Sequence, residues 1–183
     1  MEKLYKRIEE LLAGENDEVL ISIEGGAGSG KSTLAAALKE RYGAEVYHMD
    51  DFFLPPSMRT EERLAEPGGN VHYERFFEEV IEGIFSYDSF SYGIFDCKEG
   101  RITRFRDAYP NRLHIIEGAY SAHPFMEDVY DLRVFLEVDE EIQKKRILER
   151  EGEKAELFFT RWIPLEKRYF EAFQIKEKSD IVL

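Results

Sequence analysis

The chain has 183 residues, with 25 Lys and Arg against 38 Asp and Glu, which gives a formal net charge of −13. This length fits one domain, and so acidic a surface argues against a nucleic-acid or membrane-surface partner. Cys97 is the single cysteine, which excludes an internal disulfide, and no apolar run reaches the ~18 residues of a membrane span, so we expect a cytoplasmic protein.

Short apolar segments alternate with helical patterns along the chain, which predicts an α/β fold with a parallel sheet and helices on both faces. Pro164 removes a backbone donor and is expected to kink the last helix near Thr160. The predicted strands are 19–24, 45–49, 114–117, 132–138 and 180–183, with a β-hairpin over 89–105. The predicted helices are 4–12, 31–41, 73–83, 139–151 and 155–173.

The segment Gly25–Ser32 matches the phosphate-binding pattern G-x-x-x-x-G-K-[ST] between a predicted strand and a predicted helix. Glycines let successive backbone N–H groups turn around a phosphate, and the helix adds its positive dipole end. Lys31 would reach the β- and γ-phosphates, and the Ser32 hydroxyl would bind Mg²⁺. The predicted nucleotide-binding residues of this loop are Gly25, Gly26, Ala27, Gly28, Ser29, Gly30, Lys31, Ser32 and Thr33.

This loop pattern also has alternative interpretations. A glycine-rich turn that binds nothing is one alternative. A dinucleotide-binding G-x-G-x-x-G/A pattern starting at Gly26 fails, because its third small residue would fall on Lys31. GTPases, ABC ATPases and motors also use such loops, but the chain contains no NKxD or LSGGQ motif. The remaining polar residues favour a kinase.

Carboxylates follow two predicted strands at the edge of the sheet where ligands bind. Asp50 is predicted to accept the proton of an acceptor hydroxyl or to orient metal-bound water, and Asp51 to cap the following turn. Glu117 follows an apolar strand and is predicted to support Mg²⁺. A loop cap and an ordinary strand-end Glu are the structural alternatives. The predicted metal set is Ser32, Asp50 and Glu117.

Arginines on the late helices are candidates for closing over the triphosphate. Arg146 and Arg150 lie one helical turn apart, and Arg161 follows them. We predict that Arg146 and Arg150 neutralise charge in the transition state and that Arg161 contacts the nucleotide. Solvent-exposed pairing with Glu149 or Glu153 is the alternative.

Taken together, the loop and the segments HMDDFF, IIEG and SDIVL resemble the uridine kinase-like branch of P-loop kinases, which also includes phosphoribulokinase and bacterial pantothenate kinase. The resemblance spans roughly Val19 to Leu183. It implies that Asp50 is the catalytic base and that Phe53 is the last aromatic residue of the D-x-F-[YF] motif. It also implies a five-stranded parallel sheet, a small β-hairpin and a lid.

The acceptor side departs from that family. His72 stands where the uridine–cytidine kinases carry the ribose-binding Asp of N-F-D-H-P. The hairpin segment from Phe95 to Gly100 lacks the Tyr, the second aromatic residue and the His of Y-D-F-x-x-H. Residues 151–154, EGEK, replace the paired arginines of the family lid. The resemblance therefore supports phosphoryl-donor chemistry more strongly than it supports uridine as the acceptor.

Residues 54–70 hold three prolines and two adjacent glycines, which predicts a long irregular segment of the kind that often carries function. Arg59 and Arg63 lie in it and could read an anionic acceptor. We expect one kinase domain over 1–183, with acceptor-side insertions at about 54–72 and 87–106 and a lid at about 146–162. The predicted substrate-binding residues are Asp50, Phe53, Arg59, Arg63, His72, Tyr73 and Phe95.

The sequence thus predicts an enzyme that uses ATP and Mg²⁺ to phosphorylate a hydroxyl of a small molecule, with uridine or cytidine as the first candidate. Pantothenate, a sugar phosphate or a nucleoside monophosphate is the alternative acceptor. A non-catalytic ATP-binding sensor is the alternative from another class. The expected partner is the small-molecule acceptor, without nucleic acid or membrane, and a homo-oligomer stays open.

Overall fold

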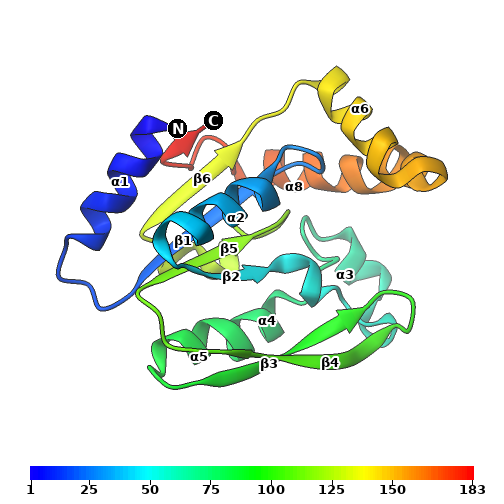
Figure 1. Cartoon of the computed structure of the whole chain (residues 1–183). Helices are drawn as coiled ribbons and strands as arrows, with labels where there is room; N and C mark the ends of the chain where they lie inside the picture. The colour runs from blue at the N-terminus through cyan, green and yellow to red at the C-terminus, as the bar shows by residue number, and fades with distance from the viewer.

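The computed structural model describes all residues from 1 to 183. Its centre is a five-stranded sheet with the order β2-β5-β1-β6-β7 (Figure 1). Every pairing in this sheet is parallel, as the sequence predicted. The strands are β1 (Val19–Gly25), β2 (Glu45–His48), β5 (Leu113–Glu117), β6 (Leu132–Leu136) and β7 (Ile181–Val182).

The helices also follow the predicted pattern. The expected break near Thr160 is a π-helical turn at Phe158–Trp162, after which Pro164 stands in the first turn of α8, where its missing donor costs nothing. A second π turn, Phe77–Ile81, joins α4 to α5. The helices are α1 (Glu2–Leu12), α2 (Lys31–Tyr42), α3 (Glu61–Ala65), α4 (Tyr73–Phe76), α5 (Glu82–Phe85), α6 (Glu140–Glu151), α7 (Ala155–Leu157) and α8 (Ile163–Phe173).

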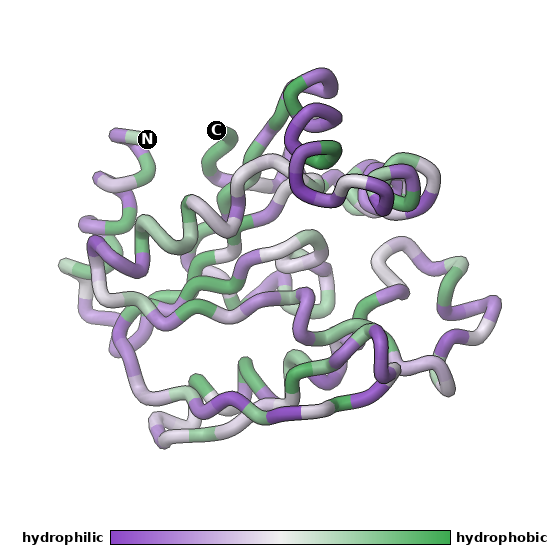
Figure 2. Tube along the Cα trace, turned by 45° about the vertical axis from the view of Figure 1, so that its right-hand side comes forward, coloured by the Kyte–Doolittle hydropathy of each residue, from purple (hydrophilic) through white to green (hydrophobic).

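Alternating side chains of the strands feed two hydrophobic cores, one on each face of the sheet. Leu20 of β1 packs into the core that also holds Phe76, Tyr92 and Tyr169. The neighbouring Ile21 packs into the core beneath α1 and α2. Figure 2 shows the hydrophobic residues gathered along the central strands, whereas α6 is largely hydrophilic. No helix is both long enough and apolar enough to cross a bilayer.

The predicted β-hairpin is a separate two-stranded sheet of β3 (Phe90–Asp96) and β4 (Arg101–Ala108). It packs against the 3₁₀ turn Met49–Phe52 that follows β2, with the rings of Phe52 and Tyr92 5.7 Å apart. In Figure 1 the hairpin lies below the central sheet, and α6 and α8 lie above it to the right. The edge of the sheet that carries the phosphate-binding loop is therefore flanked by both regions.

Candidate active site

The loop Gly25–Ser32 joins β1 to α2 and has the backbone shape that a phosphate requires. Gly30 has φ +102°, a conformation that L side chains rarely adopt, and it directly precedes α2. The first amides of α2 have no partner inside the helix, so they can donate to an anion. The ammonium group of Lys31 donates to the carbonyl of Gly26 at 2.9 Å, which keeps it folded over the loop.

Two of the predicted metal-binding residues, Ser32 at the start of α2 and Glu117 at the end of β5, meet beside this loop. Parallel pairing sets Glu117 of β5 next to both Ile23 of β1 and His48 of β2. The Ser32 hydroxyl donates to the Glu117 carboxylate at 3.2 Å. These are hard oxygen donors, which Mg²⁺ prefers together with phosphate oxygens and water. No group of three His, Cys, Asp or Glu side chains that could hold a metal ion is present.

His48 is a residue of this site that the sequence analysis did not select. Its Nδ1 lies 2.5 Å from Glu117 Oε1, and this hydrogen bond raises the pKa of His48. The imidazole and the Ser32 hydroxyl thus both contact Oε1 of the Glu117 carboxylate. The signal in the sequence was its place near the end of the predicted strand 45–49, two residues before Asp50.

Asp50 lies in the 3₁₀ turn after β2, at the same edge of the sheet. Its side chain is open to solvent at the rim, yet protein atoms surround the carboxyl group closely enough that desolvation raises the pKa of Asp50. Lys31 lowers that pKa, and Glu117 raises it, so all three groups share one electrostatic environment. Desolvation also raises the pKa of the half-buried Asp51, and no side-chain cap from Asp51 to the turn is present.

The three predicted lid arginines differ in what they contact. Arg146 donates to the carbonyls of Gly28 at 2.9 Å and Ser29 at 3.4 Å, so it reaches the phosphate-binding loop. Arg150 forms an exposed ion pair with Glu151 at 2.7 Å, a residue that the predicted alternative did not include. Arg161 lies over its neighbour on the chain, the indole ring of Trp162, at 4.8 Å. The structure brings only Arg146 of the three onto the loop.

On the acceptor side, the segment after Asp50 runs beside the start of α4. Phe53 is half-buried, forms a bridge with Val71 and lies with its ring 6.2 Å from that of Trp162. The backbone of His72 donates to Phe52 O at 2.7 Å, and burial lowers the pKa of the His72 imidazole. Phe95 is buried on β3, so its contribution to a substrate surface is small.

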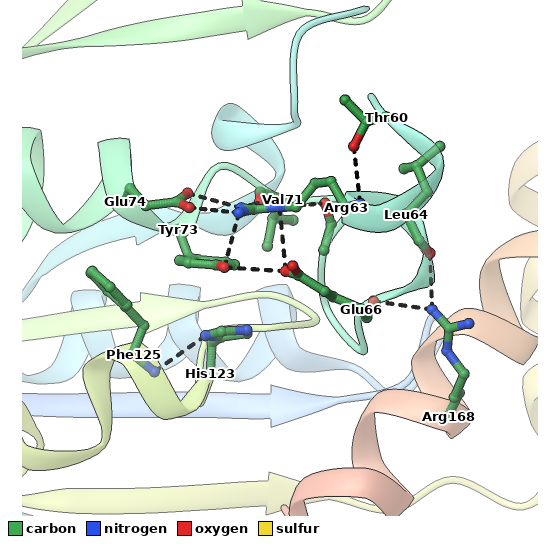
Figure 3. A network of polar contacts seen from close by, with 11 residues as sticks. Thr60, Arg63, Leu64, Glu66, Val71, Tyr73, Glu74, His123, Phe125 and Arg168 are labelled. Carbon is green, nitrogen blue, oxygen red and sulfur yellow. Dashed lines mark hydrogen bonds and ion pairs between the residues drawn. The ribbon is translucent and has the colours of Figure 1, made fainter. Parts of the chain in front are cut away.

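The contacts of Arg63 correct the expectation that this residue reads an anionic acceptor. All five guanidinium N–H groups are used inside the protein, by the carbonyls of Gly69 and Val71, by the Tyr73 hydroxyl and by both oxygens of Glu74 (Figure 3). No donor of Arg63 remains to read an anionic acceptor. The side chain instead closes the 54–72 segment onto α4.

Tyr73 belongs to the same network, which corrects its assignment as a substrate contact. Its hydroxyl accepts from Arg63 and lies 3.4 Å from the Glu66 carboxylate, and its ring stacks on His123 with centroids 4.1 Å apart. Arg59, by contrast, has one hydrogen bond, from Nε to Leu54 O at 2.8 Å, and is otherwise exposed. Arg59 is therefore the cation of this segment that is free to contact a ligand.

A cavity of about 380 Å³ lies between this segment and the last helix. Two arginines, Arg161 and Arg168, line it, and no residue of its wall is acidic. Neither arginine forms an ion pair in this structure. Arg168 donates to the carbonyls of Leu64 and Glu66, which ties α8 to the segment (Figure 3). The wall consists of Leu64, Asn70, Thr160, Arg161, Pro164, Leu165 and Arg168.

Comparison with known proteins adds relatives of low identity but broad coverage. The uridine kinase of Chlamydia pneumoniae is 24% identical over 180 residues, covering 90% of this chain and 81% of that protein. The uridine kinase of Ligilactobacillus salivarius is 24% identical over 150 residues, covering 76% and 70%. A solved structure described as a possible uridine kinase from Bacillus stearothermophilus superimposes with a TM-score of 0.71 at 19% identity over 99% of both chains. No family model matches the chain.

Proposed function

Because this chain belongs to the uridine kinase-like group of P-loop kinases, we propose that it transfers the γ-phosphoryl group of ATP, with Mg²⁺, to a hydroxyl of a small molecule. The observation that carries the proposal is the meeting of Lys31, Ser32, Glu117 and Asp50 at one edge of the sheet. A phosphate cradle, a metal-binding oxygen pair and an open carboxylate are the three parts that phosphoryl transfer requires.

Each of these groups has a defined task in the proposed reaction. The amides of the loop and Lys31 hold the β- and γ-phosphates. Ser32 and Glu117 would hold Mg²⁺, which supplies charge neutralisation on the phosphate oxygens when bound. Asp50 accepts the proton of the acceptor hydroxyl as the oxygen attacks phosphorus, and its raised pKa brings it closer to neutral pH, where a general base is most effective.

Uridine or cytidine is the first candidate acceptor, since the curated relatives are named uridine kinases. A second candidate is an acceptor that carries an oxyanion, such as pantothenate, a sugar phosphate or a nucleoside monophosphate. The cavity lined by Arg161 and Arg168 and the nearby Arg59 favour this second candidate, because these cations have no carboxylate partner in a chain of net charge −13.

The test is an ADP-release assay with Mg·ATP and acceptors in matched pairs, uridine with uridine monophosphate and pantothenol with pantothenate. We expect acceptor-dependent turnover that Asp50→Asn lowers by about 10²–10⁴-fold in kcat, with the KM for ATP little changed. Asp128→Asn, an exposed acid in the 3₁₀ segment between β5 and β6, is the control.

The outcomes separate the candidates. Turnover of the neutral members of the pairs supports a nucleoside-type acceptor, and turnover of the charged members alone supports the oxyanion-bearing class. Full activity of Asp50→Asn would contradict its role as the base. Tight ATP binding without turnover of any acceptor would favour the non-catalytic sensor over the kinase.

A further inference from the structure

The phosphate-binding loop is held from outside by side chains of the two late helices. The backbone N–H of Ala27 donates to Glu166 Oε2 of α8 at 2.9 Å. The carbonyl of the same residue accepts from Gln143 Nε2 of α6 at 2.8 Å. Both backbone groups of Ala27 are therefore fixed by helices that lie more than one hundred residues further along the chain.

The packing around this contact is tight. A Cβ on Gly26 would lie 3.0 Å from Gln143 Nε2 and 3.5 Å from Glu166 Oε2, so both side chains press against the loop. Arg146, one turn after Gln143, adds a hydrogen bond to Gly28 O at 2.9 Å. A shift of the loop at 26–28 relative to α6 and α8 would therefore break hydrogen bonds to both helices.

The chemistry of Glu166 is unusual for a helix contact. Its side chain is only 7% exposed, and burial of a carboxylate costs free energy that one amide hydrogen bond repays only in part. Burial raises the pKa of Glu166, and the hydrogen bond from Ala27 and the charge of Lys31 lower it. A neutral apolar residue would be easier to accommodate here, and such exceptions to local rules concentrate at functional sites.

We propose that Gln143 and Glu166 are positioning residues that couple the lid segment to the phosphate-binding loop. In this view they do not touch the nucleotide. They hold Ala27 so that the loop has its phosphate-binding shape only when α6 and α8 are in place. Triphosphate binding to the loop then changes the position of the lid. The inference rests on the proposed use of ATP by this loop.

The chain provides its own reporter for this coupling. Trp162 is the single tryptophan, lies in the π turn of the lid and is one helical turn before Glu166. We expect Mg·ATP to change the fluorescence of Trp162 in the wild-type protein. Calorimetric titration with Mg·ATP measures affinity in the same samples, so binding and lid response are read separately.

The variants distinguish a hydrogen-bonded positioning role from general packing. Glu166→Ala and Gln143→Glu should each raise the Kd for Mg·ATP about tenfold, which is within the range of one lost hydrogen bond, and reduce the Trp162 response at saturating nucleotide. Glu166→Gln keeps an oxygen that can accept from the Ala27 N–H, so its Kd for Mg·ATP should lie within about twofold of the wild-type value. Glu171→Ala, exposed on the same helix, is the matched control.

The experiment distinguishes failure of the proposed coupling from failure of the proposed function. A wild-type protein that does not bind Mg·ATP would remove the proposed function itself. Wild-type binding together with unchanged affinity and an unchanged Trp162 response in Glu166→Ala would overturn the coupling and leave the donor site standing. Failure of Glu166→Gln to rescue would also overturn it, because an acceptor oxygen at this position would then be irrelevant. A KM for the acceptor that stays constant across the variants would support it.

Discussion

The nucleotide side and the acceptor side of the site satisfy their polar groups in different ways. On the nucleotide side, Lys31 has one carbonyl partner and the first amides of α2 have none within the helix. On the acceptor side, Arg63 forms five hydrogen bonds with its own surroundings, two of them to the carboxylate of Glu74. The first set is free to bind a ligand, and the second set builds the wall beside which a ligand would lie.

This difference predicts that substitutions on the two sides separate activity from stability. On the nucleotide side, Lys31→Ala should lower kcat/KM by about 10²–10³-fold, because a charge aimed at the transferring phosphate is lost. The protein should stay folded, since a single hydrogen bond contributes about 1 kcal/mol and shifts Tm by roughly 2–4 °C in a chain of this size. Steady-state kinetics and thermal unfolding measure both effects.

The matched control for that substitution is Lys39→Ala, which removes an exposed lysine from the same helix and should change neither quantity. A large loss of stability in Lys31→Ala with activity retained in the folded fraction would contradict the comparison, because Lys31 would then belong to the fold rather than to the ligand.

On the acceptor side, Arg63→Ala should act mainly on stability. It leaves Glu74 without its partner and removes hydrogen bonds to two backbone carbonyls, which we expect to cost about 2–3 kcal/mol in the free energy of unfolding. In a chain of this size that corresponds to a fall in Tm of roughly 4–12 °C. Thermal or urea unfolding gives the value directly.

Arg59→Ala provides the contrast, since Arg59 lies in the same segment with one hydrogen bond to Leu54 O. It should leave Tm within roughly 4 °C of the wild-type value. If Arg63→Ala instead unfolded like the wild-type protein and raised only the KM of the acceptor, the network in Figure 3 would not carry the stability assigned to it.

The geometry of the proposed nucleotide side was predictable because it follows from short-range pattern. A glycine loop between a strand and a helix defines where the amides of Gly25–Ser32 point, and parallel pairing then sets Glu117 beside β1. The parallel sheet and the hairpin followed from the alternation of apolar and helical segments and from turn residues, and the resemblance to the kinase family implied that the sheet has five strands. The helix break at Phe158–Trp162 followed from Pro164.

The acceptor side was less predictable because residue type does not tell which partner an arginine finds. Arg59 and Arg63 are four residues apart and look alike in the sequence, but only Arg63 meets Glu74 and the carbonyls before α4. Glu166 was missed for a related reason. It stands in a charged helix, and only the packing of α8 on the loop shows that this one carboxylate is buried.

A buried path joins the two sides. Beyond Tyr73, the ring of His123 lies 6.0 Å from that of Tyr169, whose hydroxyl is 3.2 Å from Glu24 Oε2. Glu24 lies on β1 directly before the phosphate-binding loop and also accepts from the backbone N–H groups of Gly25 and Ala122. Burial outweighs these donors and raises the pKa of Glu24 from 4.5 to about 8.

The raised pKa gives a pH dependence of known sign. Below pH 4.5 the Glu24 carboxyl is protonated in both the folded and the unfolded chain. As pH rises from there to about 8, the unfolded chain releases this proton and the folded chain retains it. The free energy of unfolding should therefore fall by up to about 1.4 kcal/mol per pH unit in this window and level off above it.

Glu24→Gln removes the titrating group, so its unfolding free energy should depend less on pH than that of the wild-type protein between about pH 5 and pH 8. Urea unfolding at several pH values measures the two slopes, and contributions from His48 and the other shifted groups cancel in their difference. Glu82→Gln, an exposed residue of α5, should keep the wild-type slope. Parallel curves for Glu24→Gln and the wild-type protein would mean that Glu24 is ionised in the fold, and that the donors at Gly25, Ala122 and Tyr169 outweigh its burial.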